Sequence, residues 1–63
     1  MKMTLNLNVR VTPAEAMALA QFVKRVGWTE FIANAVDEDE AYDIRDAIYA
    51  LQDALAEEGY APR

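Results

Sequence analysis

Residues 2–11 alternate strictly between apolar and polar side chains. The apolar positions share one face and the polar positions share the other: Met3, Leu5, Leu7, Val9 and Val11 against Lys2, Thr4, Asn6, Asn8 and Arg10. A period of two is typical of a half-buried β-strand. No second strand is predicted, so this one must pair with a second copy or another protein, or lie as a ridge across the helices.

A first helix is predicted from Pro13 to about Val26. Thr12 is a good N-cap, Pro13 suits the first helical position, and Glu15 stands where the acid of a capping box belongs. Gly27 then ends the pattern. Apolar residues at helical spacing predict a buried face made of Ala16, Leu19, Val23 and Val26, with Ala20 and Phe22 beside them.

A short helix is predicted next, with Thr29 as its cap. We expect Trp28, Phe31 and Ile32 to fill the space between the two long helices, because a small core usually needs its aromatic side chains.

A long helix is predicted within residues 36–60. Asp37 is a good N-cap and Glu40 a capping-box acid, while Gly59 suits the residue after the C-cap, with Tyr60 contacting Leu55. Spacings of three and four residues predict the buried stripe of this helix: Ala41, Ile44, Ile48, Leu51 and Leu55.

The opposite side of the long helix carries a row of carboxylates, which we call the acidic row: Asp39, Asp43, Asp46, Asp53 and Glu57. It extends about 27 Å at about 1.5 Å per residue, and Ala50 interrupts it. Tyr42 and Tyr49 border it. Like charges three and four residues apart are locally unfavourable. The row is therefore either an ordinary solvated face or a surface kept for binding.

These elements predict a small α+β protein: one N-terminal β-strand, a helix, a short helix and a long C-terminal acidic amphipathic helix. The 63 residues form a single domain, 1–63. A chain this short buries a small core, and without Cys or His it has neither a disulfide nor a zinc site to support that core. Oligomerisation or a partner is the remaining common source of stability.

The composition argues against catalysis. Ser, Cys and His are absent, which removes the commonest nucleophiles and the commonest general base. The acids at 37–40 lack the spacing of a calcium loop, so we expect no metal site, no cofactor and no enzymatic activity. No apolar run reaches membrane-spanning length and no secretion signal is evident, so a cytoplasmic location is expected.

Charge is distributed unevenly along the chain. Residues 1–26 hold four basic residues and one acid, a net charge of +3, whereas residues 27–63 hold ten acids and two basic residues, a net charge of −8. The whole chain carries −5. Such a field favours basic partners and disfavours nucleic acid near the long helix.

One interpretation follows from the acidic row. A rigid line of carboxylates can compete with DNA for the Lys and Arg side chains of a nucleic-acid-binding groove, and Tyr42 and Tyr49 would add interface contacts. The segment VGWTEFIANAVDEDEAYDIRDA resembles the centre of small proteins of phages and mobile elements. The chain resembles anti-CRISPR proteins that mimic DNA against type I CRISPR complexes. The resemblance implies a protein of the bacterial cytoplasm that blocks target-DNA binding by a Cascade complex.

A second interpretation rests on residues 4–36, which resemble ribbon-helix-helix repressors and antitoxins. Asn6, Asn8 and Arg10 would then read DNA bases from a ribbon made by two copies of the strand. The turn after Gly27 is short for that family, and the long helix is too long and too acidic. A third possibility is a scaffold that dimerises through its strand. The charge distribution favours the first interpretation.

Overall fold

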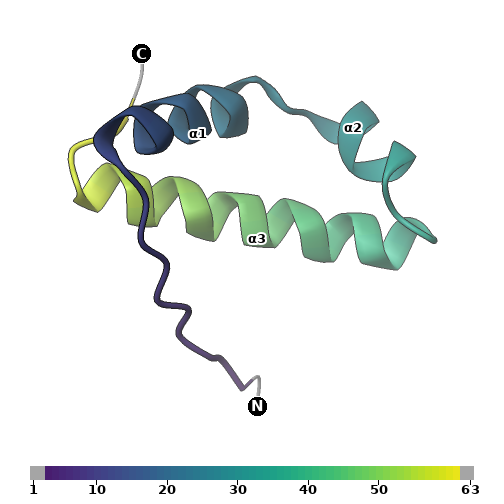
Figure 1. Cartoon of the computed structure of the whole chain (residues 1–63). Helices are drawn as coiled ribbons and strands as arrows, with labels where there is room; N and C mark the ends of the chain where they lie inside the picture. The colour runs from purple at the N-terminus through teal and green to yellow at the C-terminus, as the bar shows by residue number, and fades with distance from the viewer. Residues whose placement is uncertain (1–2, 62–63) are drawn as a thin grey trace.

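The computed structural model describes residues 3–61, and this part of the chain contains three α-helices. They are α1 (Pro13–Arg25), α2 (Trp28–Ala33) and α3 (Glu38–Glu57). Figure 1 shows α1 and α2 following one another along the same side of α3, which contacts both of them. The longest helix therefore holds the two shorter ones together.

The predicted α+β class is wrong, because the described residues are all-helical and contain no strand. The N-terminal segment, residues 3–12, leaves the helices as an exposed trace without regular structure (Figure 1). Residues 3–11 make no backbone hydrogen bond in the described part of the chain. A strand is defined by bonds to a neighbouring strand, and no other described segment is available to pair. Lys2 lies outside the described residues.

The predicted start of α1 is confirmed. The hydroxyl of Thr12 accepts a hydrogen bond from the amide of Glu15 at 3.1 Å, and the amide of Thr12 donates to the carboxylate of Glu15 at 2.8 Å. Val26 is the C-cap rather than the last helical residue. The inner face is confirmed except for one member: Ala16, Ala20 and Val23 are buried, Leu19 and Val26 are partly buried, but Phe22 is 57% exposed.

The short helix α2 begins one residue earlier than its expected cap. Gly27, not Thr29, is the N-cap, and its amide donates to the carboxylate of Glu30 at 3.3 Å. Phe31 is buried as expected, but Trp28 and Ile32 are 41% and 39% exposed. The expectation that all three apolar side chains fill the space between the helices is therefore correct for Phe31 alone.

Both predicted ends of α3 are confirmed in the structure. Asp37 caps the helix by accepting from the amide of Glu40 at 2.9 Å. The carboxylate of Glu40 accepts from Val36 at 3.1 Å, one residue before its expected partner. At the other end, Tyr60 donates to the carbonyl of Leu55 at 2.8 Å, and Gly59, at φ +92°, donates to the carbonyl of Ala56 at 3.0 Å. These two bonds define a Schellman motif.

The main core lies between α1 and the C-terminal half of α3. It consists of Ala16, Ala20, Val23 and Leu55, against which Leu19, Ile48, Leu51 and Tyr60 pack. A side-chain hydrogen bond also joins the two helices, since Gln52 donates to the carbonyl of Val23 at 2.8 Å. The predicted stripe of α3 faces inward: Ala41 and Leu55 are buried, and Ile44, Ile48 and Leu51 are partly buried.

Candidate partner-binding surface

The acidic row lies on the exposed side of α3. Each of its five members, Asp39, Asp43, Asp46, Asp53 and Glu57, is exposed to solvent. Helical geometry places them on one side because their spacings are close to whole turns. The N-cap Asp37 and the Schellman turn at Gly59 fix where this row begins and ends. The structure thus brings all five predicted acids together on a single rigid element.

One cation lies beside the acidic row and contacts it. Arg45 donates to a carboxylate oxygen of Asp46 through two nitrogens, at 3.1 Å and 3.0 Å. This is the single salt bridge among residues 3–61. Both side chains are 38–50% exposed, so solvent screens the pair and its contribution to stability is small. Its larger effect is on charge, because it partly neutralises the middle of the row.

An aromatic cluster borders the row at the α2 end. The ring of Tyr42 lies 4.8 Å from the ring of Trp28, and Phe31 packs edge-on against Trp28 at 6.5 Å. The guanidinium of Arg45 lies 4.9 Å from the centre of the Tyr42 ring, within cation–π distance. Tyr42 therefore contacts both a cation and an indole, whereas Tyr49 is 55% exposed.

Two members of this surface were not expected from the sequence. The sequence predicts Trp28 in the core, but it is exposed beside Tyr42. Arg45 was counted only as a charge, although a signal existed: it is the one cation of α3, three residues after Tyr42 and next to Asp46. Residues three apart on a helix are neighbours, which makes the Tyr42–Arg45 contact readable from spacing.

The alternative DNA-reading residues lie on a different element. Asn6, Asn8 and Arg10 are exposed along the N-terminal segment. They are not part of the acidic surface. The structure therefore separates the two predicted sites instead of combining them into one.

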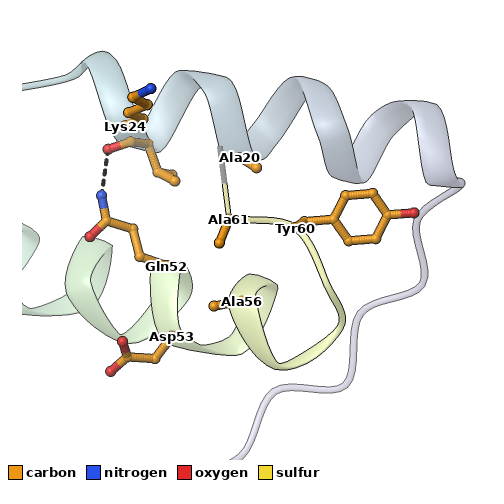
Figure 2. A pocket seen from close by; sticks show the side chains of 8 residues that line it. Ala20, Lys24, Gln52, Asp53, Ala56, Tyr60 and Ala61 are labelled. Carbon is orange, nitrogen blue, oxygen red and sulfur yellow. Dashed lines mark hydrogen bonds between the residues drawn. The ribbon is translucent and has the colours of Figure 1, made fainter. Parts of the chain in front are cut away.

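Two hollows adjoin α3. The smaller, about 210 Å³, lies between α1 and the end of α3, with Lys24, Gln52 and Tyr60 in its lining (Figure 2). The larger is an open, mainly apolar groove between the N-terminal segment and the helices α1 and α3. Among residues 3–61, no group of three acids is arranged to hold a metal ion. None of the three helices is both long and apolar enough to cross a membrane.

Comparison with known proteins gives a family but no function. No curated protein and no solved structure matches this chain. The model of a family of unknown function, DUF7706, matches residues 1–63. Because the match covers the whole sequence, the chain belongs to that family.

Proposed function

We propose that this protein acts by binding a basic protein surface through the acidic row of α3, in competition with nucleic acid. The observation that carries this proposal is the exposure of all five carboxylates along one helix side, with Arg45 as the single cation on that helix. Basic grooves gain affinity for DNA by neutralising closely spaced negative charges. A rigid line of carboxylates can bind the same Lys and Arg side chains.

The charge density of the row sets a limit on this mimicry. One DNA strand carries a phosphate about every 3.4 Å, so about eight phosphates span the same length. The row offers five carboxylates, of which Asp46 is paired with Arg45. Charge is thus sufficient to steer association, but affinity must also come from other contacts.

The bordering aromatic side chains can supply those contacts. Trp28, Tyr42 and Tyr49 are all more than two-fifths exposed, beside the row. Tyr, Trp and Arg are the residues most often found at the energetic centre of protein interfaces. The proposed binding surface is therefore the acidic row together with these three rings.

The resemblance to anti-CRISPR proteins suggests a specific partner. In this proposal the protein acts in the cytoplasm of a bacterial host, where the acidic row occupies the DNA-binding groove of a type I Cascade complex. Binding there would prevent recognition of target DNA.

The test combines a gel-shift assay with size-exclusion chromatography, using purified Cascade with and without target duplex. We expect the protein to comigrate with Cascade and to prevent the DNA shift. The triple variant D39N/D43N/D53N keeps side-chain shape but removes three charges. At about 0.2–1 kcal/mol per ion pair, it should bind about 3- to 150-fold more weakly at low salt.

A matched pair of single variants separates the row from net charge. Asp43→Asn lies within the row, whereas Glu38→Gln removes one charge from an exposed residue outside it. The first should weaken binding and the second should leave it nearly unchanged. Failure to bind Cascade would rule out this partner, and equal effects of the two variants would rule out the row as the contact surface.

A second candidate function, DNA binding in the manner of ribbon-helix-helix proteins, has one observation in its favour. Asn6, Asn8 and Arg10 are exposed on a segment that no described helix covers. A duplex-only lane in the same gel tests it. Retardation of duplex DNA by the protein itself, lost on Arg10→Ala, would support this function and overturn the first.

A further inference from the structure

The groove beside the N-terminal segment leaves much apolar surface uncovered. It measures about 1060 Å³ and is lined on one side by Leu5, Leu7 and Val9, and on the other by Leu19, Leu51 and Ala54. Small-molecule pockets are enclosed and measure roughly 300–1,000 Å³. This groove lies at the upper end of that range and is open to solvent along one side, so an extended polypeptide could lie in it.

The apolar side chains of the N-terminal segment are more exposed than those of a folded protein usually are. Leu5, Leu7 and Val9 are 77%, 80% and 73% exposed, and Met3 is 93% exposed. Contiguous apolar surface of this kind marks an interaction site. In addition, the backbone amides and carbonyls of residues 3–11 have no hydrogen-bond partner in the described part of the chain.

The core is small for a protein that folds alone. Three of the six buried residues are alanines, and in the described residues no large side chain is fully buried. A chain of this length is marginally stable unless something adds buried area. Covering the groove would extend the core across Leu19 and Leu51, which are already half-buried beside it.

We infer that a second copy of this chain covers the groove, so that the protein is a homodimer joined through its N-terminal segments. The chain itself supplies both halves of the contact, an exposed apolar segment and an apolar groove. The groove lining holds two charged residues of opposite sign, Arg10 and Glu58, and no member of the acidic row. Two copies that each carry −5 repel one another. The groove lining holds one cation and one anion, so the contact itself adds no like-charge repulsion.

Twofold symmetry makes the contact self-complementary. Each copy contributes one exposed apolar segment and one apolar groove, so each segment covers the groove of the other copy. The same arrangement allows Arg10 of one copy to approach Glu58 of the other. The five acids of the row do not line the groove, which reaches the row only at Ala50, so the inference does not rest on the proposed partner binding.

Sedimentation equilibrium over a wide range of concentrations tests the dimer. The wild-type chain should sediment with twice the mass of one chain, and Leu7→Glu should weaken the dimer by about 100-fold or more, because each copy would bury a carboxylate. The control is Asn8→Glu, the same charge one residue away, outside the groove lining. It should leave the dimer nearly intact. A wild-type monomer at all concentrations would overturn the inference.

Hydrogen exchange on the wild-type chain provides a readout that needs no variant. Amides of residues 4–10 should become protected as concentration rises through the dimer dissociation constant, because the second copy excludes water from them. The amide of Asp39, on the acidic side, should not change. A stable dimer in which residues 4–10 still exchange freely would show that another surface joins the copies, and would also overturn the inference.

Discussion

The two exposed sides of α3 carry opposite chemistry. One side holds the five carboxylates of the acidic row, and the other contributes Ala47, Leu51 and Ala54 to the apolar groove. Ala50 also lines the groove, so the two surfaces meet at the position that interrupts the row. A single 20-residue helix therefore presents two surfaces on which different forces operate.

Because different forces act on them, the two surfaces respond to solution conditions in opposite ways. Attraction between exposed charges falls as salt rises, with a screening length of about 10 Å at 0.1 M. The stabilisation gained by burying apolar surface does not weaken as salt rises, and salts that are excluded from protein surfaces increase it. Binding by the acidic row and closure of the groove are therefore separable by experiment, even though both use α3.

The largest effect is expected from placing a charge on the apolar side. Ala54→Glu keeps a good helix former but puts a carboxylate in the groove lining. We expect the dimer dissociation constant to rise about 100-fold or more, since both copies would bury the charge. Ala56→Glu is the control, because Ala56 is also exposed on α3 but lines the smaller hollow and not the groove.

Sedimentation and circular dichroism together decide the outcome of this comparison. Ala54→Glu should be monomeric with its helical signal retained, and Ala56→Glu should dimerise like the wild type. If both variants dimerise equally, the groove is not the interface. If both lose the dimer, total charge and not the place of the charge governs association.

A smaller effect is expected at the end of α3. Gly59 has φ +92°, which L side chains rarely adopt, and its turn places Tyr60 against Leu55 at the end of the groove. Gly59→Ala should lower the free energy of unfolding by about 1–2 kcal/mol. For a protein of this size, each kcal/mol lowers Tm by about 4–8 °C.

Gly27→Ala is the control for the backbone strain that a side chain would introduce at Gly59. Gly27 is extended, at φ −140°, and no atom lies within 4 Å of an added Cβ. Its substitution should change Tm little. Thermal unfolding of both variants at one concentration gives the answer, and a Gly27→Ala loss as large as that of Gly59→Ala would contradict strain as the cause.

The start of α1 and both ends of α3 could be predicted because their signals are local. Thr12, Pro13 and Glu15 specify the start of α1 within one turn, and Asp37 and Gly59 do the same for α3. A helix forms its hydrogen bonds within its own segment, so its sequence pattern is sufficient. The exposed row Asp39–Glu57 followed from the same periodicity.

The structure of the N-terminal segment and the burial of the aromatic rings could not be predicted, because both depend on contacts with other parts of the structure that periodicity does not reveal. Residues 3–11 alternate as a strand does, but a strand needs a second one beside it, and the described chain supplies none. Trp28 and Phe31 are both aromatic and three residues apart, yet Phe31 is buried and Trp28 is exposed. Which ring faces the core depends on how α2 meets α3, and this is a property of tertiary packing.

The smallest effect is expected from substitution of Arg45, which partly neutralises the acidic row and does not line the groove. Arg45→Ala removes the contact with Asp46 and the contact with the Tyr42 ring. Unfolding free energy should change by no more than about 0.5 kcal/mol, because the pair is exposed. Affinity for a basic partner should rise about 2- to 5-fold, since the row gains one free carboxylate.

Arg25→Ala is the control, because it makes the same charge change at the end of α1. Titration at two salt concentrations distinguishes the two: if both variants bind equally tightly, net charge and not the row determines the affinity.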